Sequence, residues 1–254
     1  MNIDLSGKIA VVTGGSGQLG RVMVRTLAGC GADVAIHYRS NREQAEKLLL
    51  EVTALGVHGM IVQADITEES SIFAMRDAIA AELGAPHIIV NNAVTQYTPW
   101  ASVLEQPLSD YESQFRTCVL HNVLMAKAFV PAMIKRGWGR VIGINTECAM
   151  QNFPGQSAYV AGKRGMDGVL RILAKEIGEH QITVNEVAPG WTISERDREE
   201  GSQRQEQYDA QVPLRHRGED QDIANAVAFL ASDLAAFITG VYLPVCGGNV
   251  MPGI

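Results

Sequence analysis

The feature that most constrains the fold is a glycine-rich turn near the N-terminus, between a strand-like run and a helical pattern. Residues 8–13 form a short apolar run, residues 14–20 read GGSGQLG, and a helical pattern continues to about Cys30. A short apolar run that stops at glycines is typical of a buried parallel strand. Glycines let the backbone approach a ligand closely, and a helix N-terminus offers N–H donors and the positive end of its dipole. This stretch therefore predicts a phosphate-binding turn in an α/β fold.

Strand-like runs alternate with helical patterns along the rest of the chain. Beyond the first strand, we predict strands at residues 31–38, 58–63, 87–90, 140–145, 183–187 and 241–245. We predict helices at residues 42–55, 67–83, 101–136 with a break at Pro107, 157–179 and 220–232. This alternation indicates an α/β protein in which residues 1–254 form a single Rossmann-type domain, a doubly wound parallel sheet of about seven strands with helices on both faces. The charged, core-poor segment 192–213 is predicted to be a mobile lid over the substrate.

The composition limits the class of protein. The chain has 254 residues, of which 46% are apolar and 19% are charged, as expected for a globular protein with a substantial core. Its net charge of −7 argues against nucleic acid or an acidic membrane as a main partner. We find no apolar run of about 18 residues, the length of a membrane span, and Met1 leads too quickly into the first strand to leave room for a signal peptide. The four cysteines show no C-x-x-C spacing, which predicts reduced thiols in a cytoplasmic protein without a metal site.

The end of the second predicted strand bears on the choice of cofactor. An acidic residue at this point binds the ribose 2′-hydroxyl of NAD in dinucleotide-binding folds. This chain instead has Tyr38, Arg39 and Ser40, with Arg42 close by. A guanidinium and a hydroxyl suit a 2′-phosphate, so NADP(H) is favoured and NAD(H) is the alternative. Asp65 ends the third strand, where its carboxylate is compatible with binding an adenine amino group and equally with capping the next helix.

Tyr159 and Lys163 are the candidate proton-transfer pair. They are four residues apart, so a helix places them one turn apart on the same face. A neighbouring ammonium favours the phenolate and lowers the pKa of a tyrosine from about 10. A tyrosine tuned in this way exchanges a proton with a substrate oxygen near neutral pH. A tyrosine and a lysine at this spacing are usually a packed ring and a solvated amine. The dinucleotide-type turn in the same chain favours a catalytic role for this pair.

Several motifs in a fixed order give the chain a resemblance to a known family. They are Thr13-Gly14 to Gly20, Asp65, Asn91-Asn92-Ala93, Tyr159-x-x-x-Lys163, Asn185-x-x-Ala188-Pro189-Gly190 and Ile238-Thr239-Gly240. With these motifs the chain resembles, from end to end, a classical short-chain dehydrogenase/reductase. Within that family it is most similar to the 3-oxoacyl-carrier-protein reductase and the sugar or polyol dehydrogenase group.

The resemblance implies an oxidoreductase that transfers hydride between a nicotinamide and a small-molecule carbonyl/alcohol substrate. Tyr159 is implied as the general acid or base, and Lys163 as the residue that binds the nicotinamide ribose and lowers the Tyr159 pKa. The family has a hydroxyl thirteen residues before the tyrosine to hold the substrate oxygen, which is Thr146 here. The implied assembly is a homotetramer or a homodimer. The residues expected to bind the cofactor, besides Tyr159 and Lys163, are Gly14, Ser16, Gly17, Gln18, Leu19, Gly20, Tyr38, Arg39, Ser40, Asp65, Ile66, Asn92, Ala93, Val94, Pro189, Gly190 and Thr192.

Two departures from the family pattern concern the implied catalytic residues. The family usually has serine where this chain has Thr146, and threonine keeps the hydroxyl while adding a methyl group. The family also places an asparagine in the long helix, where it supports a water relay to the lysine. An ungapped count puts Cys118 at that position, and a thiol replaces a carboxamide poorly. Asn122, one turn later on the same helix face, is our candidate substitute.

Two further departures lie in the cofactor site. Classical members read T-G-x-x-x-G-x-G, which requires glycine at Gln18, whereas this chain has Gly17 instead. The spacing resembles that of the extended branch of epimerases and dehydratases, but 254 residues leave no space for their longer substrate domain. Gly17 also replaces the basic residue that many NADP-preferring relatives carry. Val94 stands where the family has glycine and is expected to crowd the adenosine side.

Three functions are compatible with these observations. Tyr159 and Lys163 favour an NADP(H)-dependent oxidoreductase of a 3-oxoacyl or sugar/polyol-like substrate. The changes at Cys118 and Thr146 leave open a dinucleotide-binding relative with little or no catalysis, acting as a sensor or structural protein. An epimerase that holds NAD tightly is the third. The charged lid favours a polar substrate, and Glu147, beside Thr146, is compatible with a contact to a hydroxylated substrate or with solvent.

Overall fold

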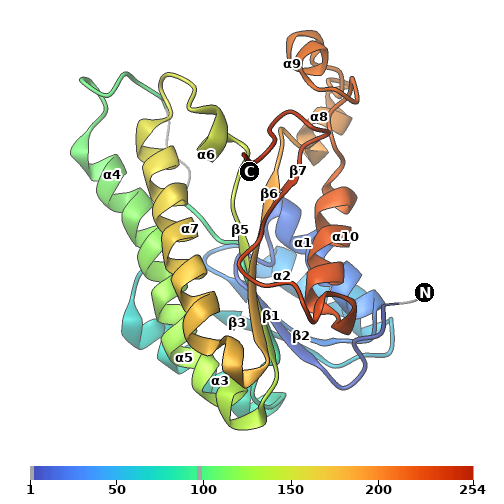
Figure 1. Ribbon diagram of the computed structural model, residues 1–254. Helices are drawn as coiled ribbons and strands as arrows, with labels where there is room; N and C mark the ends of the chain where they lie inside the picture. Colours follow the sequence, from blue (N-terminus) through green and yellow to red (C-terminus); the bar gives the residue numbers. More distant parts are fainter. Residues whose placement is uncertain (1–2, 96–98, 254) are drawn as a thin grey trace.

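Seven parallel strands form the sheet around which the rest of the chain is arranged (Figure 1). The computed structural model describes residues 3–95 and 99–253. Across the sheet the strands follow the order β3-β2-β1-β4-β5-β6-β7, and each neighbouring pair is parallel. This confirms the predicted doubly wound parallel sheet. The strands are β1 Ile9–Val12, β2 Asp33–Tyr38, β3 Gly59–Gln63, β4 Ile88–Asn91, β5 Gly139–Ile144, β6 Ile182–Pro189 and β7 Tyr242–Val245.

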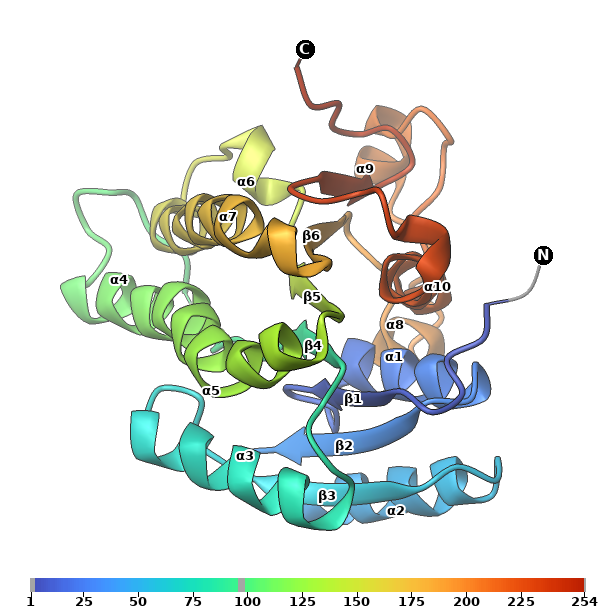
Figure 2. The same ribbon diagram turned by 60° about the horizontal axis from the view of Figure 1, so that its bottom comes forward.

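Helices cover both faces of the sheet, which explains why the strands read as continuous apolar runs. Figure 2 shows α3, α5 and α7 on one face and α1, α2 and α10 on the other. The helices are α1 Gln18–Gly29, α2 Arg42–Thr53, α3 Glu69–Glu82, α4 Leu108–Gln114, α5 His121–Arg136, α6 Cys148–Gln151, α7 Ser157–Ile177, α8 Glu195–Glu199, α9 Glu206–Gln211 and α10 Asp220–Ala231, with short helical turns at η1 Phe115–Leu120, η2 Gly178–His180 and η3 Asp233–Ala235.

Each face of the sheet has its own apolar core. On one face α3 buries Ile72, Met75 and Ile79, spaced three and four residues apart, and these pack with α5 and α7. On the other face α1 buries Met23 and Leu27 in a core shared with α2 and α10. Burying a side chain of this size contributes roughly 1.5–3 kcal/mol. The two cores therefore hold the strand ends at the carboxyl edge in fixed positions.

The helix before β5 starts later than the sequence predicted. Residues 101–107 lie outside it, and α4 begins at Leu108, directly after Pro107. Proline disfavours the α conformation in the residue before it, so a helix cannot easily run through from residue 101. The expected helix at 101–136 is therefore wrong in its first seven positions.

The sequence analysis found no apolar run long enough to span a membrane, and the same helix differs from that expectation. α4, the π-helical turn η1 and α5 form one continuous helix, Leu108–Arg136, which is long and apolar enough to cross a membrane by length and composition. In this structure 56% of its most apolar window is buried inside the protein. It packs against α3 and α7 in the core of one face, as core helices of globular proteins do.

Loops and short helices gather at the carboxyl edge of the sheet. The order of the strands reverses between β1 and β4, so the turn after β1 and the loop after β4 leave the sheet side by side. The short helix α6 follows β5, and α8 and α9 follow β6 (Figure 1). Open α/β sheets bind ligands at such a point of reversal.

Candidate active site

A cavity of about 950 Å³ lies at this carboxyl edge. Most of the residues that the sequence predicted for cofactor binding or catalysis line it. Tyr38 and Asn122 do not: Tyr38 is buried in the core shared with α1, and Asn122 is buried behind the cavity wall. The predicted residues that line the cavity are Gly14, Ser16, Gly17, Gln18, Leu19, Gly20, Arg39, Ser40, Asp65, Ile66, Asn92, Ala93, Val94, Thr146, Tyr159, Lys163, Pro189, Gly190 and Thr192.

The glycine turn between β1 and α1 has no room for side chains at two positions. Gly14 has a φ of +64°, and a Cβ atom there would lie 3.1 Å from Nδ2 of Asn92. A Cβ atom on Gly20 would overlap the carbonyl oxygen of Gly14. Gly17 caps α1, whose first turn carries no acidic residue. The backbone of the glycine turn thus packs closely against the N-terminus of α1, and that N-terminus is suited to binding a phosphate group.

His37, at the end of β2, lies beneath this turn and lines the cavity. Its Nδ1 accepts a hydrogen bond of 2.8 Å from the Gly14 N–H, and its Nε2 lies 3.0 Å from the carbonyl oxygen of Ala64. These partners assign the ring hydrogen to Nε2. Burial lowers the pKa of His37, so the neutral ring holds the glycine turn to the end of β3.

Arg39 and Ser40 lie at the end of the cavity where the adenosine ribose is expected. The Arg39 side chain is 68% exposed, and its Nε lies 3.7 Å from Oδ2 of Asp65. Oδ1 of Asp65 accepts hydrogen bonds from the Thr67 N–H at 2.9 Å and the Thr67 hydroxyl at 2.7 Å, which lower the pKa of Asp65. The carboxylate thus shapes the entry to α3, while the N-cap of that helix is Glu68. Arg39 remains the exposed cation beside the cavity wall.

Gln18 and Val94 occupy the two positions where the family pattern expects glycine. Both line the cavity. The Gln18 amide reaches across to the lid segment (192–213), where Nε2 lies 3.4 Å from the carbonyl oxygen of Ile193. Val94 is half-buried against the core of the α3 face. Each side chain therefore has a partner in the protein away from the glycine turn.

Helix α7 presents Tyr159 and Lys163 to the cavity. Lys163 is buried, and its Nζ lies 5.8 Å from the centre of the Tyr159 ring. Nζ also donates a hydrogen bond of 2.6 Å to the carbonyl oxygen of Ile144 at the end of β5. Burial lowers the pKa of Lys163. The ammonium is thus anchored to the sheet within reach of the tyrosine.

Thr146 lines the same cavity as Tyr159 and Lys163, just beyond the end of β5. Its hydroxyl oxygen accepts a hydrogen bond of 3.2 Å from the Cys148 N–H, so the hydroxyl hydrogen is directed elsewhere. Its own N–H donates to Oδ1 of Asn145 at 2.9 Å, and its carbonyl oxygen accepts from the Tyr242 hydroxyl. These bonds hold the Thr146 backbone in place while its hydroxyl faces the cavity.

Cys118 and Asn122 lie on the long helix, behind Lys163. Cys118 falls within the π-helical turn η1, and Asn122 Nδ2 donates a hydrogen bond of 2.6 Å to its carbonyl oxygen. The Asn122 Oδ1 accepts from Nδ2 of Asn91 at 2.7 Å. A π turn interrupts the regular pattern of backbone pairing, and here a side chain supplies the donor. Burial raises the pKa of the Cys118 thiol, whose sulfur lies 3.6 Å from Oε1 of Gln114.

Glu147 is buried rather than exposed to solvent. Its Oε1 accepts a hydrogen bond of 2.7 Å from the Tyr208 hydroxyl in α9, and its Oε2 accepts one of 3.0 Å from Nδ2 of Asn249. The Tyr208 oxygen in turn accepts from the Trp191 N–H at 2.9 Å. Burial raises the pKa of Glu147. This carboxyl group thus joins the end of β5, the lid segment and the C-terminal tail.

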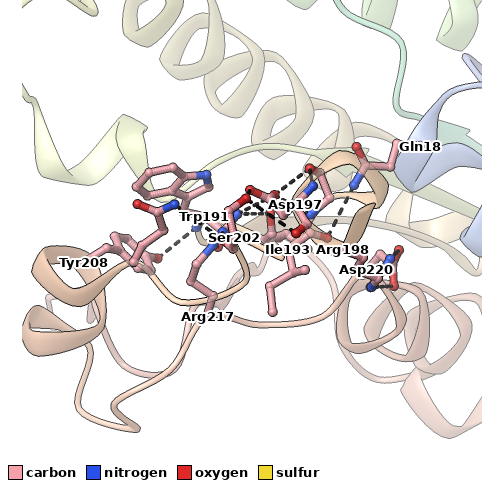
Figure 3. A network of polar contacts seen from close by, with 12 residues as sticks. Gln18, Trp191, Ile193, Asp197, Arg198, Ser202, Tyr208, Arg217 and Asp220 are labelled. Carbon is pink, nitrogen blue, oxygen red and sulfur yellow. Dashed lines mark hydrogen bonds and ion pairs between the residues drawn. The ribbon is translucent and has the colours of Figure 1, made fainter. Parts of the chain in front are cut away.

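A buried arginine ties down the base of the lid segment (Figure 3). The guanidinium of Arg217 donates to the carbonyl oxygens of Trp191, Thr192 and Ser202, and pairs with Oδ2 of Asp197 at 2.9 Å. This pairing strongly lowers the pKa of Asp197. Arg198 pairs with Asp220 and Glu219 at the start of α10. The lid segment thus has a fixed base.

Several cavity residues escaped the sequence analysis. His37 lies inside an apolar strand, and nothing in the local pattern marks its contact with Gly14. Eight further ones are aromatic and amide side chains, for which the available signal was a concentration of glutamine and aromatic residues in core-poor segments. They are Trp100, Gln151, Phe153, Gln156, Trp191, Gln207, Tyr208 and Gln211.

The cavity residues fit a nicotinamide dinucleotide, because the glycine turn lines the cavity and α1 offers its N-terminus, without an acidic residue in its first turn, to an anion. Within residues 3–95 and 99–253, no group of three His, Cys, Asp or Glu side chains is placed to hold a metal ion.

Comparison with known proteins places the chain in a family. A family model described as enoyl-(acyl carrier protein) reductase matches residues 16–249. The chain is 36% identical over 250 residues to the 3-oxoacyl-(acyl-carrier-protein) reductase FabG of Pseudomonas aeruginosa, covering 98% of this chain and 100% of the relative. It is 37% identical over 258 residues to the FabG protein of Escherichia coli, with coverage of 98% and 100%.

Solved structures agree with this placement. A crystal structure of NAD⁺-bound xylitol dehydrogenase matches with a TM-score of 0.88 and 27% identity, covering 96% of this chain and 99% of that one. A mutant of a Serratia marcescens short-chain dehydrogenase/reductase matches with a TM-score of 0.88 and 31% identity, covering 96% and 98%. The chain belongs to the short-chain dehydrogenase/reductase family. It is a classical member close to the 3-oxoacyl-(acyl-carrier-protein) reductases, an NAD(P)-dependent oxidoreductase that acts on CH–OH or C=O groups.

Proposed function

We propose that the protein is an NADP(H)-dependent oxidoreductase that interconverts a carbonyl group and an alcohol on a polyhydroxylated, sugar- or polyol-like substrate. The observation that carries this proposal is that one cavity is lined by Tyr159, Lys163 and Thr146 together with the glycine turn and Arg39. A binding protein without catalysis has no need for a buried ammonium beside a tyrosine and a hydroxyl, so the non-catalytic alternative is not favoured.

The preference for NADP(H) rests on the end of β2. The exposed guanidinium of Arg39 and the hydroxyl of Ser40 line the cavity, and neither position carries a carboxylate that would repel a 2′-phosphate. Asp65 is the nearby acid, and its Oδ1 is already bonded to Thr67. A phosphate that draws Arg39 away from Asp65, now 3.7 Å distant, gains a charge-assisted hydrogen bond.

The nicotinamide cofactor, when bound, supplies the hydride or takes it up. In the reducing direction Tyr159 donates its proton to the carbonyl oxygen, and Thr146 donates a hydrogen bond to the same oxygen. Lys163, held by Ile144, favours the phenolate that Tyr159 becomes. In the oxidising direction the same phenolate takes the proton from the alcohol. Asn122 supports this arrangement indirectly, by bonding the Cys118 carbonyl in the wall behind Lys163.

The substrate class is inferred from the wall of the cavity near α6 and the lid segment. Aromatic side chains alternate there with amides, which suits a ligand with apolar C–H faces and many hydroxyl groups. Glu147 adds a buried carboxyl group next to Thr146. The half-exposed aromatic residues are Trp100, Phe153 and Trp191, and the amides are Gln151, Gln156, Gln207 and Gln211.

A 3-oxoacyl thioester is the second candidate substrate. It is favoured by the names of the curated relatives, which share 35–37% identity with this chain over nearly their whole lengths. An acyl chain offers a single carbonyl next to a long apolar tail. It therefore has less use for the four amides and the carboxyl group in this part of the cavity wall.

We also propose that residues 192–213 act as a mobile lid within a single domain. Its base is held by Arg217, whereas α9 projects from the body of the protein (Figure 1). The bond between Tyr208 and Glu147 links α9 to the cavity. Motion of α9 about the fixed base opens and closes the substrate end.

The assembly proposed is a homotetramer or homodimer of a cytoplasmic protein. The exposed side of the helices before and after β5 carries Leu108, Phe115, Ile134 and Ile172, which are 37–80% exposed. Apolar groups on such a face favour contact with a second copy. All four cysteines are free thiols, as a reducing compartment requires.

Two measurements test the proposal. The first is a titration with NADPH and with NADH, followed by the fluorescence of Trp100 and Trp191, which line the cavity. We expect tighter binding of NADPH; tighter binding of NADH contradicts the role of Arg39 and Ser40. The second compares xylulose with acetoacetyl-coenzyme A as oxidant of bound NADPH. Faster turnover of xylulose supports the polyol assignment, and faster turnover of acetoacetyl-coenzyme A overturns it in favour of the second candidate.

A further inference from the structure

A buried carboxyl group, that of Glu186, is in contact with the partly exposed carboxyl group of Asp167 near the proposed active site. Glu186, in the middle of β6, is 2% exposed and does not line the cavity. Its side chain is hydrogen-bonded to that of Asp167, one turn beyond Lys163 on α7. Asp167 also accepts a hydrogen bond of 2.6 Å from Nε of Arg171. Neither of these two acids has a role in the mechanism described above.

Asn145 connects Glu186 to the catalytic residues. Its Oδ1 accepts from the Thr146 N–H at 2.9 Å, and its Nδ2 donates to Glu186 at 2.5 Å and to the carbonyl oxygen of Lys163 at 3.2 Å. The Thr146 N–H can only donate, so it fixes which end of the amide faces which way. Glu186 must therefore accept from Asn145 with one oxygen.

The Glu186 side chain is also hydrogen-bonded to that of Asp167. Two carboxylates in hydrogen-bond contact require one proton between them. Asp167 is already paired with the Arg171 guanidinium at 2.6 Å, whereas Glu186 is buried, so the proton is assigned to Glu186. Burial raises the pKa of Glu186, in agreement with this placement. The other ionisable groups near it are Lys163 on α7 and Tyr242, its register partner on β7.

We propose that Glu186 holds a proton shared with Asp167, and that it is a positioning residue which, through Asn145, sets the placement of Thr146 and Lys163. The protonated acid donates to Asp167 and accepts from Asn145, so every member of the chain from Arg171 to Thr146 is bonded. The consequence for catalysis rests on the proposed roles of Thr146, Tyr159 and Lys163.

Loss of the shared proton has a defined effect on the site. Ionised Glu186 places a second negative charge near Lys163 and offsets the positive charge that the lysine presents to Tyr159. The pKa of Tyr159 then rises, and less phenolate is present to take a proton from an alcohol. In the native enzyme, alcohol oxidation therefore increases with pH less steeply than it would with a neutral group at position 186.

Two substitutions of Glu186 separate the effect of its charge from the effect of its hydrogen bond with Asn145. Glu186→Gln keeps an oxygen for Asn145 and an N–H for Asp167 but carries no charge at any pH. Glu186→Val removes the acceptor for Asn145. Thr183→Val is the matched control on the same strand, because Thr183 is buried and its hydroxyl has no hydrogen-bond partner among the described residues.

The assay is oxidation of xylitol with NADP⁺ across pH 6–10, together with cofactor binding. For Glu186→Gln we expect turnover within about threefold of the parent at pH 7, with the rise on the alkaline side moved to lower pH by about 0.5 unit or more. For Glu186→Val we expect turnover to fall about tenfold or more with little change in cofactor affinity. Thr183→Val should leave both unchanged. An unshifted profile in Glu186→Gln, or full turnover in Glu186→Val, overturns the positioning role.

Infrared spectroscopy of the intact protein tests the shared proton without any need for turnover. A buried protonated carboxyl group absorbs at higher frequency than a carboxylate, and we expect such a band at pH 7 that disappears in Glu186→Gln and persists in Thr183→Val. Its absence from the parent protein contradicts the proposal even when Glu186→Val fails to fold. An enzyme that shows the band but turns over neither xylitol nor xylulose would instead contradict the proposed function.

Discussion

The hydroxyl of Tyr208 in α9 donates a hydrogen bond of 2.7 Å to Oε1 of Glu147 at the end of β5. This bond joins the lid segment to the residue next to Thr146. A buried carboxylate is costly when it loses a partner, so the contact stabilises α9 in the position seen in this structure. The amide of Asn249 completes the site from the C-terminal tail at 3.0 Å.

Removal of the Tyr208 hydroxyl should weaken substrate capture. Tyr208→Phe deletes one hydrogen bond to a charged group, worth about 1.5–3 kcal/mol, so we expect kcat/KM to fall about tenfold or more. Cofactor affinity should be unchanged. Tyr111→Phe is the control, since that hydroxyl bonds Ser157 at 2.6 Å outside the cavity. Equal kinetics for the two variants would show that the lid contact does not matter for the reaction.

Arg39 should control the choice between the two nicotinamide cofactors. Arg39→Ala removes a charge-assisted hydrogen bond to the 2′-phosphate, and we expect NADPH to bind roughly 10–100-fold more weakly while NADH is unaffected. Arg42→Ala is the matched control because Arg42 pairs with Glu46 and does not line the cavity. A loss of NADPH affinity in both variants would indicate a general effect of positive charge, and no loss in either would remove Arg39 from the site.

The glycine turn allows a direct comparison of two substitutions. Gly20→Ala would drive a methyl group into the Gly14 carbonyl oxygen, and we expect a loss of about 3 kcal/mol in the free energy of unfolding. Gly17→Ala places its Cβ atom 3.1 Å from the same oxygen, which a small shift relieves. We expect it to cost about 1 kcal/mol or less. Urea denaturation of both variants checks the order, and a larger loss for Gly17→Ala would contradict the geometry.

Two buried histidines and a half-buried one should make the fold sensitive to acid. Burial lowers the pKa of His37, and it lowers the pKa of His87 to about 4 and that of His121 to about 3. Because the unfolded chain takes up these protons near pH 6.5 and the folded chain does not, their contribution is fully present above about pH 6.5. It is lost progressively as the pH falls from there toward 3.

Urea denaturation at pH 7.5, 6 and 5 measures this loss. We expect the free energy of unfolding to fall over the series in the parent protein and to fall less in His121→Gln. His58→Gln is the control, because His58 lies on the surface with an 85% exposed side chain. A free energy that stays constant from pH 7.5 to 5 would contradict the account.

Much of the fold follows from local sequence. The strands could be predicted because each is a short apolar run that ends at glycine, proline or a polar residue, as at Asn91 and Pro189. The start of α4 was misplaced because the helical pattern before Pro107 belongs to a turn in which Gln106 bonds back to Ser102. The π-helical turn at Cys118, whose carbonyl oxygen accepts a side-chain bond from Asn122, has no signal in the sequence.

The residues of the candidate site also fall into those that the sequence predicted and those that it did not. Tyr159, Lys163 and Thr146 were found because a fixed spacing along the chain marks them. The partners of Glu147 lie 61 and 102 residues away, in α9 and in the tail. Glu186 reads from sequence as one polar residue in a strand. The packing of α7 on β6 brings it to Asp167, and the pairing of β5 with β6 brings it to Asn145.

The most direct test of the account is the kinetics of Tyr159→Phe. This variant keeps the ring beside Lys163 but has no proton to give. We expect turnover of xylulose with NADPH to fall by about 10²–10⁴-fold, the usual contribution of a general acid, while the affinity for NADPH stays within a few-fold of the parent protein. Turnover in Tyr159→Phe equal to that of the parent would contradict the proposed role of Tyr159.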